Sequence, residues 1–360
     1  MRRRDVVLGA LAAASCASAP SAVPISFRSG RPIVIAHRGA SGLRPEHTMS
    51  AYRLAIAQGA DFIEPDLVMT RDGRLICRHE NEISGTTDIA DRPEFADRRV
   101  TKSIDGQEVQ GWFTEDFTLE ELRTLRCKER LPQLRPDNVQ YDGQEPIPTL
   151  EEVFALARDE SARLGRTIGL YPEMKHPTHF LLGGLSMPDA VRNFLNANNL
   201  NRREAPVFVQ CFEEAALISL RLQGVRTRLV FLVAASGSPY DRVAAQRPRT
   251  YAEYLAAPMN ELREFCDGLG VEKSLLIPGP ADPAQGDIVR RAHDAGLVVH
   301  AWTFRAENYF LPAEFRRGDS AAPDFMRQHG DLAGEVRAFT ALGLDGLFTD
   351  FPAEAVAALA

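Results

Sequence analysis

Eight short apolar runs, rich in β-branched and aromatic residues, alternate along the chain with amphipathic helical patterns. Strands that alternate with helices are typical of parallel α/β folds. Eight such units close naturally into a (β/α)8 barrel. No G-x-G-x-x-G motif follows the first run, which disfavours the competing open, doubly wound sheet. The predicted strands are residues 33–36, 61–66, 167–171, 207–210, 227–232, 268–271, 297–302 and 344–348.

A further apolar run, residues 75–79, follows the second strand after only the turn sequence Thr70-Arg71-Asp72-Gly73. Parallel neighbours need a crossover of about a dozen residues, so this short link predicts an extra antiparallel hairpin arm. The hairpin would bring His79 opposite Asp66. Residues from about 81 to 146 are polar and turn-rich, which predicts a loop-rich insertion over the carboxyl ends of the strands. We expect one catalytic domain, residues 31–360, that contains this insertion.

Residues 1–22 have the pattern of an export signal. A basic start, Met1-Arg2-Arg3-Arg4, precedes an apolar stretch over residues 6–14 and the small residues Ala17-Ser18-Ala19. The arginines resemble a twin-arginine signal, and ordinary secretion is the alternative. The sequence around Cys16 resembles a lipoprotein box, so a lipid anchor at Cys16 is a further alternative. The pattern predicts an exported, periplasmic protein.

The overall composition narrows the classes of partner. The formal net charge is −7, which argues against a nucleic-acid partner but allows a small anionic substrate where basic side chains gather locally. The five cysteines form no CxxC or CxxH pair, so a zinc site has no support. Beyond the export signal, no apolar run is long enough for a transmembrane segment.

Carboxylates cluster at the ends of two predicted strands. Glu64 and Asp66 are two residues apart on one strand and so point to the same face, and Glu173 and Lys175 repeat this spacing. Three converging carboxylates without cysteine suit a hard divalent cation, Ca²⁺ first and Mg²⁺ second. The alternative is a set of buried ion pairs with Arg38 and Lys175, but burying so many charges for stability alone is unfavourable.

Basic and titratable side chains accompany these carboxylates. His37 ends the first strand and His79 ends the hairpin, so one imidazole could act as general base and the other as general acid. Arg38 can bind a phosphate oxygen in bidentate fashion, and Lys175 supplies a second positive charge. We give less weight to the other histidines: His47 at a helix start, His176, His179 and His293 on loops or the surface, and His300 in the core or the site.

Several segments together resemble the bacterial periplasmic glycerophosphodiester phosphodiesterase family. The most specific are HRGASG and PEHT within residues 37–48 and the E-x-D pair at residues 64–66. RHE, DFTLEEL, IPTLEE, GLYPEMK, VQCF and GLFTDFP also match, so the resemblance extends from about residue 33 to 352. It implies a barrel that hydrolyses glycerophosphodiesters with the help of a metal ion.

The resemblance implies a role for each site residue. It gives Glu64, Asp66 and Glu173 as metal ligands, His37 and His79 as acid and base, and Arg38 and Lys175 as phosphate-binding residues. Glu46 matches a further acid near the metal, and Gln210, Phe212 and Trp302 match positions that line the pocket. Glu80 departs from the pattern because many relatives have aspartate there, so its role is left open.

The predicted reaction is hydrolysis of deacylated phospholipids to glycerol 3-phosphate and an alcohol such as choline or ethanolamine. A lysophospholipase D or other phospholipase-type activity is the nearest alternative, but no basic amphipathic helix for membrane docking is evident. Another alternative is a surface-displayed binding protein on the same scaffold, with a calcium site that is only structural. The presence of both histidines and all three carboxylates favours the enzyme.

Overall fold

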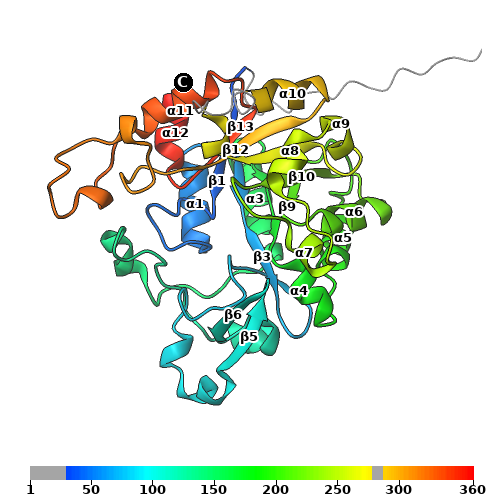
Figure 1. The fold of residues 1–360 in the computed structure, drawn as a ribbon. Coiled ribbons are helices and arrows are strands. Elements are labelled where there is room, and N and C mark those ends of the chain that lie inside the picture. Colours follow the sequence, from blue (N-terminus) through cyan, green and yellow to red (C-terminus); the bar gives the residue numbers. More distant parts are fainter. Residues whose placement is uncertain (1–29, 278–286) are drawn as a thin grey trace, which may run out of the picture.

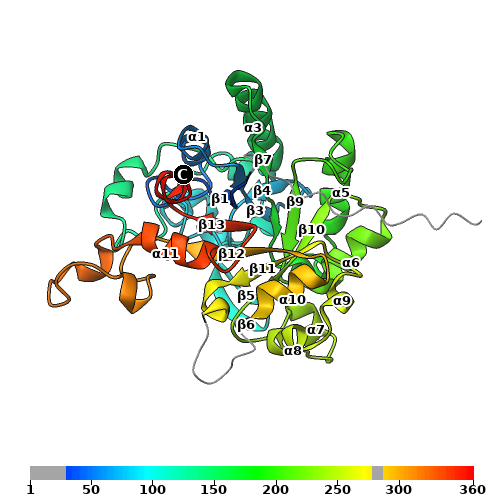
Figure 2. The same cartoon turned by 90° about the horizontal axis from the view of Figure 1, so that it is seen from above.

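The structure is a computed structural model that describes residues 30–277 and 287–360. The predicted export signal and Cys16 lie outside these described residues. The predicted strands all occur, and because β2 continues into β3 and β7 into β8, their pairing closes into a ring with the helices outside it (Figures 1 and 2). The eight barrel positions are β1 (Ile33–His37), β2 with β3 (Phe62–Glu64, Asp66–Met69), β7 with β8 (Gly169–Leu170, Glu173–Met174), β9 (Phe208–Cys211), β10 (Arg228–Val233), β11 (Gly268–Glu272), β12 (Val298–Phe304) and β13 (Gly346–Thr349).

Prolines interrupt two of the barrel strands next to the predicted site. Pro65 separates β2 from β3, and Pro172 lies between β7 and β8, because proline has no amide hydrogen to donate to the ladder. The hydrogen bonds continue on either side: Tyr171 N donates to Ile63 O at 3.0 Å, and Glu173 N donates to Pro65 O at 2.9 Å. The second and third strands are therefore broken at the point where they carry their carboxylates, which the sequence-based bounds missed.

The register places the polar residues of neighbouring strands side by side. His37 pairs with Glu64 between β1 and β2, and Asp66 pairs with Glu173 between β3 and β8. Glu173 in turn pairs with Gln210 of β9. These positions lie at the carboxyl ends of the strands, where barrel enzymes carry their active sites.

The predicted hairpin arm is confirmed. Strand β4 (Leu75–Cys77) runs antiparallel to β3, with Leu67 opposite Cys77. Arg78 N then donates a hydrogen bond to Asp66 O at 3.0 Å. His79 thus leaves the hairpin one residue beyond the pair with Asp66, close to the predicted register.

The segment 81–146 contains more regular structure than its polar sequence predicted. It holds a hairpin of β5 (Val100–Ile104) and β6 (Gln107–Gly111), besides the short helix α2 (Leu119–Leu122). Both hairpin strands are largely exposed, so they lack the alternation of buried apolar residues that marks a strand in sequence. Figure 1 shows this hairpin beyond the barrel, in cyan.

Five of the helices on the outside of the barrel, α1, α3, α5, α8 and α11, begin at a residue whose side chain caps the helix. Thr149 and Glu152 form a reciprocal capping box at the start of α3, and Thr48 caps α1 through the amide of Ala51. The main outer helices are α1 (Met49–Ala57), α3 (Leu150–Leu164), α4 (Pro177–Leu182), α5 (Met187–Ala197), α6 (Glu214–Leu222), α7 (Tyr240–Ala244), α8 (Tyr251–Ala256), α9 (Met259–Leu262), α10 (Ile288–Asp294), α11 (Leu332–Thr340) and α12 (Pro352–Ala358). Among the described residues, no helix combines the length and the apolar character that crossing a membrane requires.

The interior of the barrel is a small aromatic and aliphatic core below the strand ends. Tyr171, Phe208 and Phe348 lie within it, and the Tyr171 hydroxyl is 2.6 Å from His300 Nδ1. Burial is the main cause that lowers the pKa of His300 to about 4, so this ring is neutral in the core. His300 is therefore a core residue.

Candidate active site

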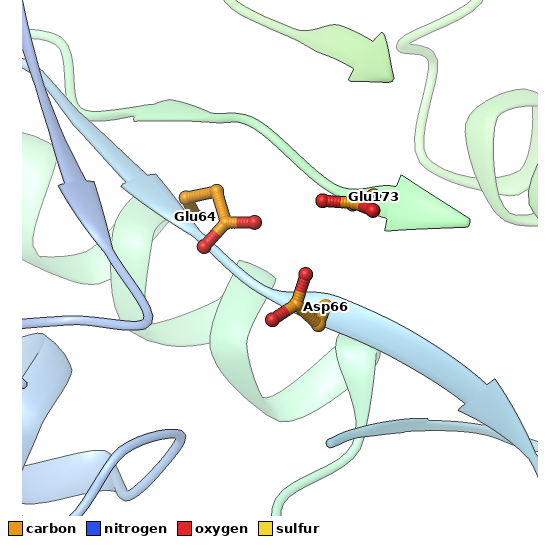
Figure 3. A group of neighbouring side chains, drawn as sticks. All are labelled: Glu64, Asp66 and Glu173. Carbon is orange, nitrogen blue, oxygen red and sulfur yellow. The ribbon is translucent and has the colours of Figure 1, made fainter. Parts of the chain in front are cut away.

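Three buried carboxylates meet at the carboxyl ends of neighbouring strands. Glu64 ends β2, Asp66 begins β3 and Glu173 begins β8, and one oxygen of each lies within 4.8 Å of the others. Figure 3 shows the three side chains pointing toward one another. Their exposed fractions are 0%, 1% and 6%, so water cannot screen their mutual repulsion effectively.

Neighbouring residues donate hydrogen bonds to some of the carboxylate oxygens, and one oxygen has no donor in the part of the chain that the structure describes. Glu64 Oε2 accepts a hydrogen bond from the Arg38 amide at 2.8 Å, and its Oε1 accepts one from Gln210 Nε2 at 3.1 Å. Lys175 Nζ lies 2.7 Å from Glu173 Oε1. Asp66 Oδ1 is buried without a hydrogen-bonding partner among the described residues. A buried oxygen that lacks a donor, within an all-oxygen group, fits a hard cation.

Electrostatics within the group point the same way. Burial, followed by the charges of Asp66 and Glu173, raises the pKa of Glu64 well above its ordinary value. Burial raises the pKa of Glu173 to about 7, against the opposing effect of Lys175. Burial also opposes the ionisation of Asp66, but Lys175 and Arg38 hold its pKa well below the ordinary value. A divalent cation would favour the ionised form of all three carboxylates.

His37 is held by a carboxylate that the sequence analysis did not assign. Its Nδ1 is 2.7 Å from Asp350 Oδ1, directly after β13. Asp350 Oδ2 accepts hydrogen bonds from Arg135 and Arg305 at 2.6 and 2.8 Å, which keeps this carboxylate ionised. An ionised partner places the imidazole proton on Nδ1 and leaves Nε2 for the cavity. Burial, then Arg38, lowers the pKa of His37 to about 4.

His79 has a similar arrangement. Its Nδ1 lies 2.6 Å from Glu80 Oε1, and Glu80 also pairs with Arg130 from the insertion. Burial raises the pKa of Glu80, but the stronger combined effect of His79 and Arg130 lowers it to about 2. Burial, then Arg38 and Lys175, lowers the pKa of His79 to about 3. Glu80, whose role was open from sequence, therefore orients the second histidine.

Replacing Glu80 by alanine should lower kcat/KM for a phosphodiester substrate by about 10- to 100-fold, the usual effect of losing the partner that orients a functional histidine. The substitution Glu80→Gln should recover part of this loss, because the amide oxygen can still accept from Nδ1. Steady-state kinetics of the two variants tests this. Equal activity of Glu80→Ala and the unmodified protein would show that Glu80 does not position His79.

Arg38 adopts a left-handed backbone conformation, with φ of 62°, that directs its side chain into the acidic group. Its Nη1 is 2.7 Å from Glu46 Oε2 and its Nε is 3.0 Å from Asp66 Oδ2. Gly39 follows with φ of 88°, and a Cβ there would approach the carbonyl carbon of Ala51 to 2.6 Å. The HRG sequence is thus required by the tight turn that presents Arg38.

His47 was given little weight from the sequence, and the structure corrects this. The ring is fully buried, with Nε2 3.0 Å from Asp66 Oδ2 and Nδ1 2.7 Å from the hydroxyl of Tyr52. Like Arg38 it has a positive φ, of 54°. His47 therefore supports Asp66 from behind. From the sequence, the position of His47 just before Thr48 predicted only the start of helix α1.

A cavity of about 440 Å³ opens above the carboxylates. Trp302 stands over it on β12, fixed by a hydrogen bond from Nε1 to Gly270 O at 3.0 Å, and Phe212 packs edge-on against Trp302. Lys175 Nζ lies 5.7 Å from the centre of the Phe212 ring. The predicted site residues that line this cavity are His37, Arg38, Glu64, His79, Glu173, Lys175, Gln210, Phe212 and Trp302. Asp66 lies in the acidic group at its floor, and Glu46 lines an adjoining cavity.

Several residues that support the site from distant loops were not predicted from the sequence. Asp350 follows a strand in Thr349-Asp350-Phe351-Pro352, so the rule used for Glu64 and Asp66 would have found it. Arg130 and Arg135, in the insertion, have no comparable signal because no periodic pattern indicates where their loop folds.

Fold and site together define an α/β barrel with an acid–histidine centre at the carboxyl ends of its strands. The model of the glycerophosphoryl diester phosphodiesterase family matches residues 37–354, and this chain belongs to that family. It is 33% identical to the Arabidopsis thaliana protein named glycerophosphodiester phosphodiesterase GDPD6, over 96% of this chain and 93% of the relative. It is 26% identical to a Haemophilus influenzae glycerophosphodiester phosphodiesterase, over 98% and 97% of the two chains.

Solved structures share the fold. A protein from Silicibacter pomeroyi, described as a glycerophosphoryl diester phosphodiesterase, superposes with a TM-score of 0.63 at 21% identity, over 92% of this chain and 94% of that one. A phosphodiesterase from Oleispira antarctica, solved in complex with the product sn-glycerol-3-phosphate, superposes with a TM-score of 0.57 at 22% identity, over 92% and 98%.

Proposed function

We propose that this protein hydrolyses glycerophosphodiesters to glycerol 3-phosphate and an alcohol with the help of a divalent cation. The observation that carries this proposal is the meeting of Glu64, Asp66 and Glu173 within 4.8 Å, in a cavity that His37 and His79 also line. Family membership and the names of the relatives support the same substrate class.

Glu64, Asp66 and Glu173 would hold the cation, and their oxygen-only set suits Ca²⁺ first and Mg²⁺ second. When bound, such an ion withdraws charge from a phosphoryl oxygen and acidifies a nearby hydroxyl or water. Arg38 and Lys175 stand beside the carboxylates and supply two positive charges for the phosphate.

The two histidines would move the protons. Each ring has its Nδ1 bonded to a carboxylate, and within the described part of the chain neither Nε2 has a hydrogen-bonding partner. One Nε2 can accept the proton of the attacking hydroxyl, and the other can donate a proton to the leaving alcohol. Burial, then Arg38 and Lys175, lowers the pKa of His79, and an anionic diester bound between Arg38 and Lys175 would oppose the part that their charges contribute.

We also propose that the protein is exported to the periplasm, on the basis of the predicted export signal in residues 1–22. A lipid anchor at Cys16 would keep the same active site near a membrane surface.

The test is hydrolysis of a panel of deacylated phospholipids by the purified protein, with glycerol 3-phosphate measured in a coupled assay. We expect turnover that a chelator abolishes and that Ca²⁺ or Mg²⁺ restores. Turnover that persists in chelator would refute the metal-dependent mechanism. Binding of glycerol 3-phosphate without turnover of any diester would favour a binding protein instead.

A further inference from the structure

The substrate cavity has a second arm. We call the cavity above the carboxylates, which contains Phe212 and Trp302, the aromatic arm. Next to it lies an adjoining cavity of about 390 Å³ whose walls include Arg130 and Arg135. We call this second cavity the arginine arm. The residues that line both arms are His37, Arg38, Arg305 and Phe310. A diester whose phosphate lies at this junction has room for one of its two alcohols in each arm.

The carboxylates that line the arginine arm are already paired with basic side chains of the protein. Asp350 Oδ1 bonds to His37, and its Oδ2 accepts from Arg135 and Arg305. Glu46 Oε2 accepts from Arg38, and its Oε1 pairs with Arg130. Both carboxylates are at most 6% exposed. They therefore offer little to a cationic ligand.

The arginines of this arm differ in how many of their donors are occupied. Arg135 uses its Nε, Nη1 and Nη2, on Glu307, Ser41 and Asp350. Arg305 uses only its Nε, on Asp350 at 2.8 Å. Its guanidinium group stacks 4.4 Å above the centre of the Phe310 ring, and its side chain is 23% exposed. Within the described residues, neither Nη atom of Arg305 has an acceptor.

We propose that the arginine arm receives the leaving alcohol and that Arg305 selects alcohols that carry an anionic group, such as a carboxylate or a second phosphate. This inference rests on the proposed function and narrows its substrate class. The Phe310 ring and Asp350 hold the guanidinium in place, so its two free Nη groups are oriented in advance for a bidentate anion.

The charged side chains of the aromatic arm already have partners within the protein. Lys175 and Lys273 both line this arm. Lys175 Nζ is paired with Glu173, and Lys273 Nζ lies 2.5 Å from Glu335. Of the acids there, Glu64 and Glu173 belong to the proposed cation site, and Glu272 is bonded to the Ala235 amide and the Ser274 hydroxyl. The free donors of Arg305, which lines both arms, therefore favour an anionic alcohol over a cationic one.

The experiment compares three diesters of glycerol 3-phosphate, formed with 3-hydroxypropanoate, propan-1-ol and choline. These leaving alcohols are anionic, neutral and cationic. We expect the unmodified protein to prefer the anionic diester over the choline diester by at least about tenfold in kcat/KM. The substitution Arg305→Gln should reduce kcat/KM for the anionic diester by about tenfold more than for the neutral diester, and Arg305→Lys should restore part of that difference.

Arg317→Gln is the matched control, because Arg317 carries the same charge on the same segment but pairs with Asp331 and lines neither arm. It should leave the order of the three substrates unchanged. A preference of the unmodified protein for the choline diester would overturn the inference, and so would an equal loss on all three diesters in Arg305→Gln. Absence of hydrolysis of every diester by the unmodified protein would instead refute the proposed function itself.

Discussion

Replacing His37 by glutamine is expected to lower kcat/KM for a glycerophosphodiester by about 10²- to 10⁴-fold, the usual contribution of a general acid or base. Glutamine is close to histidine in size and can donate a hydrogen bond to Asp350, but it cannot exchange a proton near neutral pH. Because His37 lies at the junction of the two cavity arms, the loss should fall on every diester alike. Steady-state kinetics with an anionic and a neutral diester measures it.

The matched control is His293→Gln, since His293 is exposed on α10 and pairs with Asp345, at the amino end of β13 and away from the site. This variant should retain normal kinetics. Asp350→Asn should reduce activity through His37, because the neutral amide no longer favours the required tautomer. If His37→Gln turned over substrate at the normal rate, the assignment of His37 as a proton-transfer group would be wrong.

Replacing Glu64 by glutamine is expected to abolish the response to divalent cations and to lower activity at least about 100-fold. Outer-shell changes alone reduce metal affinity or activity by about 10- to 100-fold, and Glu64 would be a direct ligand. Without a cation, the same variant should be no less stable than the unmodified protein, because it removes a carboxylate that two others repel. Loss of function combined with unchanged or higher stability distinguishes a metal ligand from a structural ion pair.

The pH dependence of stability provides a second test of the three-carboxylate site, through Glu173. Without a cation, burial raises the pKa of Glu173 to about 7 in the folded protein, whereas an unfolded glutamate titrates near its ordinary value. At Glu173 the folded state then binds more protons, so the contribution of this residue to the free energy of unfolding falls as pH rises toward about 7. A bound cation should remove this loss, and it should add about 2.7 kcal/mol at about 100 times its Kd.

Urea unfolding at about pH 5 and about pH 8, with and without Ca²⁺, measures these effects. We expect Ca²⁺ to stabilise the unmodified protein more at the higher pH, and to have little effect on Glu64→Gln. Equal stabilisation of both proteins would place the cation somewhere other than at Glu64, Asp66 and Glu173.

The order of the strands and most residues of the candidate site were predictable from local patterns in the sequence. Apolar runs of the right length predicted the barrel, and the spacing of Glu64 and Asp66 predicted a shared face. The short turn before residue 75 predicted the antiparallel arm. The hairpin of β5 and β6 was missed, because its strands are exposed and carry no apolar alternation.

The proline breaks show where local reasoning was incomplete. A strand through Glu64-Pro65-Asp66 was expected to be continuous, but proline cannot donate to the ladder and the strand divides there. The carboxylates still meet, because hydrogen bonds on either side keep Glu173 next to Asp66. The predicted convergence was therefore confirmed, although the strand bounds were not.

The sequence by itself identified the candidate groups for the chemistry, because residue type and strand periodicity are local properties. It identified the three carboxylates, the two histidines and the positively charged residues beside them, Arg38 and Lys175. Only the tertiary structure decided how those groups are held. Asp350 reaches His37 across 313 residues of sequence, and Arg305 and Arg135 meet on the same carboxylate oxygen. Such contacts depend on how the barrel closes and how the loops fold over it, and no local pattern encodes either.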